Sequence, residues 1–263
     1  MMNPALGQPL LGPSDPPPAV VIRAGASTEF LLIGDHAGNA IPSSLSGLGV
    51  AARDLARHIA WDIGVRALGE ALSAELDATF VCQPFSRLVI DCNRDARSPS
   101  SIVDSADGTL VPGNVGLDAD AREERRATIH EPYHRAIATA LARRRAQGAR
   151  PILVALHSFT PSLDGAVRPW QLGLLHDEGD TTLTYALLHR LRQEAHLRVG
   201  DNEPYRMNGT DYTIPRHAYP GADRYLEVEF RQDLLPDRES ARLWANRFAG
   251  WLRDAMALAM KPA

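Results

Sequence analysis

Two histidines stand where apolar segments of the chain end. His36 follows the apolar run of residues 30–33, and His157 follows the run of residues 152–156. Each run has the length of a β-strand, and α/β enzymes place their sites outside the carboxyl ends of parallel strands. Imidazole is a preferred zinc ligand, and catalytic zinc sites combine three protein ligands with one open position. The pair predicts an open metal site, the alternative being two loop histidines that bond only to nearby backbone.

Two residues are candidates for the third ligand. Asn39 forms a His-x-x-donor pattern with His36, although an amide is a weak ligand for zinc. Asp62 lies in an apolar stretch four residues after His58, a spacing that places both on one face of a helix. The alternative for this second pair is a surface ion pair. Both Asn39 and Asp62 are therefore kept as candidate metal ligands.

Two glutamates alternate in the strand-like segment of residues 225–230. Glu227 and Glu229 point to one face of such a strand, opposite its apolar residues. Unpaired buried charge is costly, so two carboxylates on a buried strand need a task such as metal binding or general-base catalysis. Pairing with Arg224 or Arg231 is the alternative.

The segment Ser-Arg-Leu-Val-Ile-Asp-Cys-Asn-Arg at residues 86–94 has polar residues on both sides of a short apolar run. An arginine presents a planar fork that binds a carboxylate through two hydrogen bonds. Asn93 and Arg94 at the end of the segment therefore suit an anionic substrate. A structural Arg87–Asp91 pair would explain the first half of the segment but not the second.

Composition narrows the class of protein. The 263 residues carry a net charge of −4, so a general basic surface for nucleic acid is not expected. Two cysteines are too few for a disulfide scaffold and suggest a reducing compartment. No apolar run approaches the roughly 20 residues of a membrane span, and residues 1–18 lack the features of a signal peptide. Glycine-rich nucleotide motifs are absent. A cytoplasmic enzyme without nucleic-acid or membrane partners is expected, its oligomeric state being open.

The elements that must position these residues alternate between strands and helices. This alternation predicts a single α/β domain over residues 21–263, with a mixed, mostly parallel sheet flanked by helices, after a flexible arm over residues 1–20. The expected strands span residues 30–33, 78–82, 88–92, 151–156, 171–175 and 225–230, and the expected helices span residues 53–76, 120–147 with a possible kink at Pro132, 181–196 and 240–260.

Six of these segments, in their order along the chain, resemble the N-formylglutamate amidohydrolases. The matching segments are residues 35–42, 58–62, 86–94, 157–161, 208–217 and 227–234. The pattern Ser-Arg-x-Val-Ile-Asp-x-Asn-Arg is the most specific of them. The resemblance implies a phosphorylase/hydrolase-like fold, distantly similar to zinc carboxypeptidases, and zinc-dependent hydrolysis of an amide.

The resemblance also implies roles for individual residues. His36 and His157 would be zinc ligands, Glu229 the general base, and Asn93 with Arg94 the pair that holds a substrate carboxylate. The carboxypeptidase loop reads His-x-x-Glu, whereas this chain has asparagine at the fourth position, which leaves the third ligand open.

An arginine is also expected to stabilise the oxyanion, with Arg87 or Arg216 as candidates. The expected substrate is a small acidic N-formyl or N-acyl amino acid, such as N-formylglutamate, or a peptide-like molecule. Two alternatives remain: a related zinc carboxypeptidase or amino-acid deacylase, and a non-catalytic anion-binding protein with the same fold.

Overall fold

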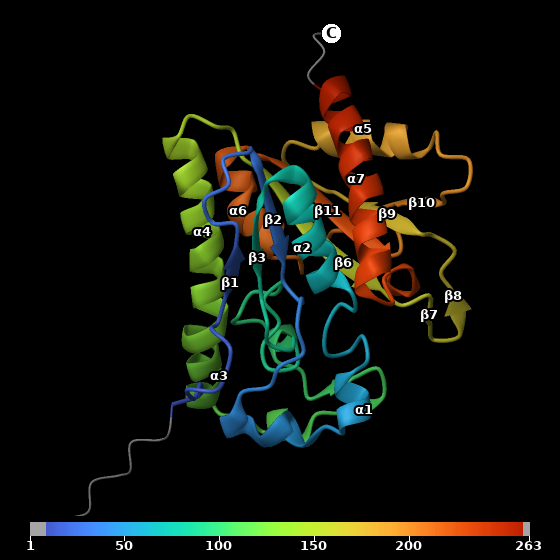
Figure 1. Cartoon of the computed structure of the whole chain (residues 1–263). Helices are drawn as coiled ribbons and strands as arrows, with labels where there is room; N and C mark the ends of the chain where they lie inside the picture. The colour runs from blue at the N-terminus through green and yellow to red at the C-terminus, as the bar shows by residue number, and fades with distance from the viewer. Residues whose placement is uncertain (1–8, 260–263) are drawn as a thin grey trace, which may run out of the picture.

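Seven strands form the central sheet of the computed structural model, which describes residues 9–259. The strands lie in the order β1 (Val20–Ile22), β3 (Thr79–Cys82), β2 (Phe30–Gly34), β6 (Ile152–Phe159), β11 (Arg224–Arg231), β9 (Leu172–Leu175) and β10 (Val199–Asp201) (Figure 1). The β1–β3 and β9–β11 pairs are antiparallel, and the other four pairs are parallel. The predicted α/β domain with a mixed, mostly parallel sheet is therefore confirmed.

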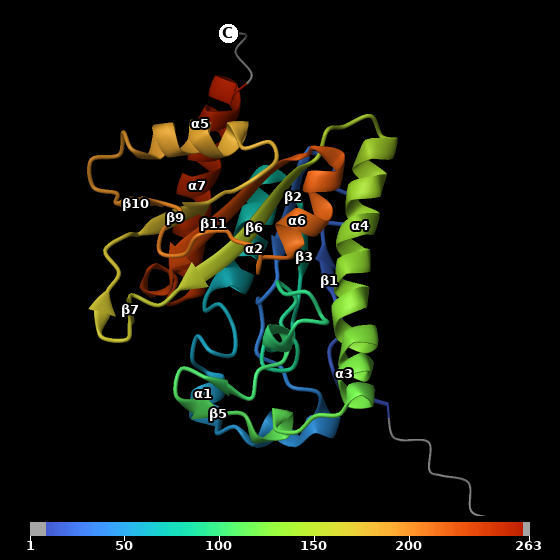
Figure 2. The same cartoon turned by 180° about the vertical axis from the view of Figure 1, so that it is seen from behind.

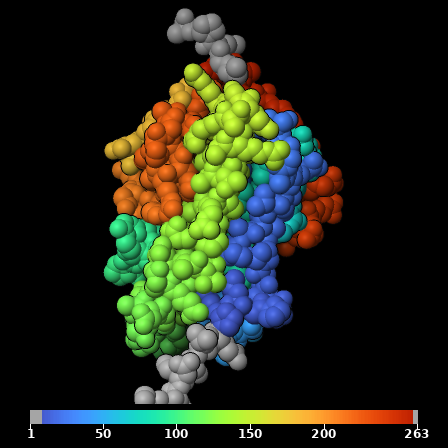
Figure 3. Space-filling view, turned by 90° about the vertical axis from the view of Figure 1, so that its left-hand side faces the viewer, coloured from blue at the N-terminus to red at the C-terminus, as the bar shows by residue number. Residues whose placement is uncertain are grey.

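Helices cover both faces of the sheet. On one face, α2 (Val65–Leu76), α5 (Thr182–Leu191) and α7 (Arg238–Ala259) bury a large apolar cluster. On the other face, α4 (Glu131–Ala146) and the short α6 (Thr213–His217) pack on the sheet (Figure 2). Figure 3 shows α4 between the orange segment that contains α6 and the blue N-terminal segment. No helix within residues 9–259 is long and apolar enough to cross a membrane.

Shorter elements complete the domain beyond the carboxyl ends of the parallel strands. A third apolar cluster there packs side chains from loops rather than from regular strands, including Leu48, Phe85 and Val89. The remaining α-helices and strands are α1 (Ala52–Leu55), α3 (Ala119–Arg125) and the hairpins β4 (Ser105–Ala106) with β5 (Thr109–Leu110) and β7 (Ser162–Leu163) with β8 (Ala166–Val167).

The helix expected over residues 53–76 is wrong in its first half. Residues 56–64 form turns between α1 and α2, and Gly64 has a φ of 84°, in the left-handed region that interrupts a helix. His58 and Asp62 therefore do not share a helix face. The backbone N–H of Asp62 instead donates to the carbonyl of His36 at 2.9 Å, which ties this loop to the end of β2.

The strand expected over residues 88–92 is also wrong. This segment consists of turns, with the Val89 N–H donating to the Ser86 carbonyl and the Arg94 N–H to the Asp91 carbonyl. Its three apolar residues 88–90 are all buried in the loop cluster, and Asn114 donates to the Leu88 carbonyl at 2.8 Å. An apolar run of this length does not by itself distinguish a strand from a buried loop.

The expected break in the helix of residues 120–147 takes the form of a π-helical turn at Arg126–His130, which joins α3 to α4. Pro132, the second residue after this turn, lacks the N–H that a regular α-helix would use at this point.

The flexible arm expected over residues 1–20 is wrong for residues 9–20, and residues 1–8 lie outside the described residues. Leu10 is buried in the loop cluster, and the Asp15 carboxylate accepts a hydrogen bond from the backbone of Ser43. This segment then enters the sheet as β1, which pairs with β3.

The contact between α2 and the sheet yields a prediction about stability. A Cβ added at Gly69 would lie 2.2 Å from Cζ of Phe80 in β3, so Gly69→Ala is expected to destabilise the fold by about 1–3 kcal/mol. Gly250 lies inside α7 with no heavy atom within 4 Å of such a Cβ, so Gly250→Ala is expected to stabilise it by up to about 1 kcal/mol. Urea denaturation of both variants checks this pair, and shifts of the same sign would contradict the packing described.

Candidate active site

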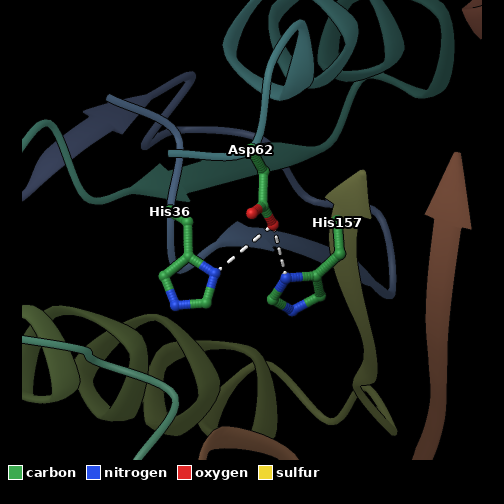
Figure 4. A group of neighbouring side chains, drawn as sticks. All are labelled: His36, Asp62 and His157. Carbon is green, nitrogen blue, oxygen red and sulfur yellow. Dashed lines mark hydrogen bonds and ion pairs between the residues drawn. The ribbon is translucent and has the colours of Figure 1, made fainter. Parts of the chain in front are cut away.

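Asp62 joins the two histidines (Figure 4). Its Oδ2 lies 2.8 Å from Nδ1 of His157 and 3.3 Å from Nδ1 of His36. His36 is the second residue after β2, whereas His157 lies inside the neighbouring strand β6. The three residues are buried, and one ligand atom from each lies within 4.8 Å of the others. The parallel strands have thus brought together two side chains that are 121 positions apart in the sequence.

Each histidine faces a second carboxylate on its other ring nitrogen. Nε2 of His36 lies 2.7 Å from Oδ1 of Asp91, and Nε2 of His157 lies 3.4 Å from Oδ2 of Asp35. A proton on each Nε2 would face its outer carboxylate and leave the lone pair of Nδ1 free. Carboxylates in this outer position are typical of histidines that bind a metal.

The pKa values of the cluster are shifted by the carboxylates around the two histidines. Burial by itself lowers the pKa of His157, but Asp35 and Asp62 raise that pKa well above its ordinary value. The pKa of His36 is also raised, because Asp91 and Asp62 outweigh burial and Arg87. The charges of both histidines hold the pKa of Asp62 below its usual range in spite of its burial. Three carboxylates thus surround two imidazoles, an arrangement that favours a bound cation.

Glu229 lies beside this cluster. It pairs in register with His157 across the parallel strands β11 and β6. The residue is 6% exposed, and its Oε2 has no hydrogen-bond partner among residues 9–259. Burial raises the pKa of Glu229 to about 7, against the opposing effect of His157. This carboxylate is therefore available to accept a proton near neutral pH.

Arg224 and Arg231, at the two ends of β11, do not pair with Glu227 or Glu229. Arg224 lies near Asp180, at 3.5 Å, and Arg231 binds Asp233, at 2.7 Å. The glutamates instead line a cavity of about 300 Å³, together with His36, His157, Arg87 and Arg94.

Arg87 and Arg94 reach this cavity from the turns of residues 86–94. Nη2 of Arg87 lies 2.6 Å from Oδ2 of Asp91, so the expected structural pair exists and holds the guanidinium beside the cluster. Nη1 of Arg94 lies 3.6 Å from Oδ1 of Asp211. Both guanidinium groups remain partly exposed, which leaves donors for an anionic ligand.

Asn93 also lines the cavity, but its carbonyl oxygen has a structural task. Its Oδ1 accepts the backbone N–H groups of Tyr212 and Thr213, each at 3.0 Å, and so fixes the start of α6. The amide nitrogen of Asn93 is the part left for a ligand, since it makes only a 3.5 Å contact with Asp211.

Two candidate residues do not join the site. Asn39 is exposed, and its side chain donates to the Leu55 carbonyl at 2.9 Å, so Asp62 rather than Asn39 meets the two histidines. Arg216 bonds to Glu131 and to the Tyr212 hydroxyl and does not line the cavity. The structure therefore does not bring Arg216, expected to bind substrate or stabilise an oxyanion, to the cavity.

Sequence patterns missed several groups at the site. Asp35 directly precedes His36, and its other oxygen accepts a hydrogen bond from Thr213 at 2.9 Å, which orients it. Tyr205 and Asp211 line the cavity from the long segment between β10 and α6. The adjacency of Asp35 to His36 was a usable signal, whereas the loop residues carry no periodicity that marks them.

The family of this chain follows from its sequence as well as from this geometry. Residues 28–235 match the family model of N-formylglutamate amidohydrolase. The chain belongs to this family. The chain is 33% identical, with a TM-score of 0.92, to a gene product from Agrobacterium tumefaciens whose crystal structure is known, over 96% of this chain and 100% of the other.

A second solved structure extends the comparison of folds. The crystal structure of N-formylglutamate amidohydrolase from Ralstonia eutropha has a TM-score of 0.67 and 18% identity to this amidohydrolase, covering 90% of this chain and 98% of the other. At that identity the likeness concerns the fold. A search of curated protein sequences gave no match.

Proposed function

We propose that this protein is a zinc-dependent amidohydrolase that cleaves an N-formyl or N-acyl amide of an amino acid and holds the substrate carboxylate with arginine. One observation carries the proposal. Nδ1 of His36, Nδ1 of His157 and Oδ2 of Asp62 converge, while Asp91 and Asp35 face the outer nitrogens of the rings.

The donor set suits zinc. Two imidazole nitrogens and one carboxylate oxygen are a common set for catalytic zinc, which keeps a further position for water or substrate. His36, Asp62 and His157 would hold the ion, and Asp35 and Asp91 would orient the two rings. Bound zinc supplies Lewis acidity and brings the pKa of a bound water to about 7.

Glu229 is proposed as the general base. Its Oε2, which lacks a partner in the described chain, would accept a proton from water and pass it to the leaving amine nitrogen. Arg87, held beside the site by Asp91, is proposed to stabilise the negative charge on the carbonyl oxygen. Arg94 and the amide nitrogen of Asn93 would bind the carboxylate and so place the amide for attack.

The role of Arg94 leads to a prediction about substrate charge. Arg94→Ala is expected to lower kcat/KM for N-formyl-L-norleucine by roughly 10- to 100-fold, because it removes charge-assisted hydrogen bonds to the carboxylate. The carboxamide of the same compound should be affected much less. Arg216→Ala is the matched control, since Arg216 lies outside the cavity and should change both substrates equally. Equal losses in the Arg94 variant would make Arg94 a structural residue.

A substrate screen tests the proposed reaction. Release of formate or another acyl group from at least one compound is the expected result, in a panel of N-acyl amino acids with acidic, neutral and basic side chains that includes N-formyl-L-glutamate. Cleavage of C-terminal residues from peptides instead would indicate a carboxypeptidase. Binding of the same compounds with no turnover of any in the zinc-loaded protein would favour the non-catalytic alternative.

A further inference from the structure

Glu227 is a buried carboxylate that the proposed chemistry does not use. It lies on β11 two residues before Glu229, and its side chain lines the same cavity. It is only 2% exposed, and no hydrogen bond or ion pair within residues 9–259 reaches its carboxylate. Because burying an unpaired carboxylate is costly, the structure leaves a place in the cavity for a group that satisfies it.

The position of Glu227 separates it from the reacting groups. A strand rises roughly 3.3 Å per residue, so Glu227 lies about 6.6 Å farther from the carboxyl edge of the sheet than Glu229. Its neighbours in register are Ala155 and Leu175, and Leu175 also lines the cavity. This separation of about 6.6 Å is close to the length of an amino-acid side chain. Glu227 is therefore placed to meet the end of a substrate side chain rather than the amide.

Burial and nearby carboxylates disfavour ionisation of Glu227. Burial raises the pKa of Glu227 to about 8, and the carboxylates of Asp211, Glu229 and Asp35 act in the same sense, with His157 opposing them. Asp211 lines the cavity from the turn before α6. A second carboxylate placed here would be repelled, and an apolar end group would leave Glu227 without a partner.

We propose that Glu227 forms a side-chain subsite that selects amino-acid substrates whose side chain ends in a cation. The ammonium group of a lysine-type N-acyl amino acid has this chemistry, and Leu175 would contact the methylene groups of its chain. The inference rests on the proposed amidohydrolase function and narrows it. The substrate carboxylate would be held by arginine, while the side chain would be basic and not acidic as in N-formylglutamate.

Turnover of matched substrates tests the subsite. N-formyl-L-lysine and N-formyl-L-norleucine differ mainly in the terminal ammonium group. The zinc-loaded wild-type protein is expected to prefer the lysine compound in kcat/KM by roughly 10- to 100-fold. Glu227→Gln is expected to remove most of that preference and to keep turnover of the norleucine compound within a few-fold. Glu178→Gln changes an exposed glutamate outside the cavity and should keep the preference.

Binding of free amino acids separates this inference from the proposed reaction. Isothermal titration with L-lysine, L-norleucine and L-glutamate reports on the subsite without any turnover. Tighter binding of L-lysine that is lost in Glu227→Gln supports the subsite even if no N-formyl compound is cleaved, in which case the proposed function fails alone. Equal binding of L-lysine and L-norleucine, or tighter binding of L-glutamate by the wild-type protein, would overturn the subsite.

Discussion

Replacing Glu229 with glutamine is expected to lower kcat by about 10²- to 10⁴-fold, the usual contribution of a positioned general base. Glutamine keeps the size and the hydrogen-bonding reach of the side chain but cannot accept a proton from water. The variant should bind zinc as the wild type does, because Glu229 lies beside the His36–Asp62–His157 group without belonging to it. Steady-state rates together with metal analysis of the purified variant measure both effects.

Glu227→Gln is the matched comparison on the same strand. With N-formyl-L-norleucine, which has no cation to place against Glu227, this variant should lose much less activity than Glu229→Gln. The opposite ranking would show that Glu227 is the base. Near-normal rates in both variants would mean that this face of β11 takes no part in the reaction.

The second large effect concerns Asp62. Asp62→Ala removes the carboxylate that lies between His36 and His157, so its zinc affinity should fall by more than the roughly 10- to 100-fold expected from loss of an outer carboxylate. Asp91→Asn, which changes only the partner of the His36 ring, should show that smaller loss. Competition with a chromogenic chelator gives the three dissociation constants on one scale.

Asn39→Ala is the control for the alternative ligand. Because the Asn39 amide donates to the Leu55 carbonyl and not toward the histidines, this variant should keep the zinc affinity of the wild type. Loss of zinc from Asn39→Ala with retention in Asp62→Ala would show that the metal-loaded protein uses a different third ligand.

Strong local patterns predicted much of the fold and part of the site. The apolar runs before His36 and within β6 are long enough to specify central strands, and their parallel pairing fixes where both histidines lie. The alternation around Glu227 and Glu229 correctly predicted that both carboxylates share one face of a buried strand. Strands β2 and β6 are buried along their whole length, as near-continuous apolar runs in a parallel sheet are.

The remaining features depend on contacts between distant segments. The turns that carry Asp62 are apolar enough to suggest a helix, but their side chains pack in the loop cluster and Gly64 has a left-handed backbone conformation. Arg216 lies in a matching segment, yet Glu131, 85 positions away, directs its side chain out of the cavity. The sequence offers only Arg87 as a partner for Asp91, because the contact of Asp91 with His36 spans 55 positions of the sequence.

The metal dependence of hydrolysis is the most direct test of the account. The purified protein should bind one zinc ion per chain, lose turnover of N-formyl amino acids when a chelator removes that ion, and recover it when zinc is restored. His36→Ala and His157→Ala should bind no zinc under the same conditions and show no recovery. Full turnover by the chelated wild-type protein, with metal analysis confirming that no ion remains, would contradict the central claim.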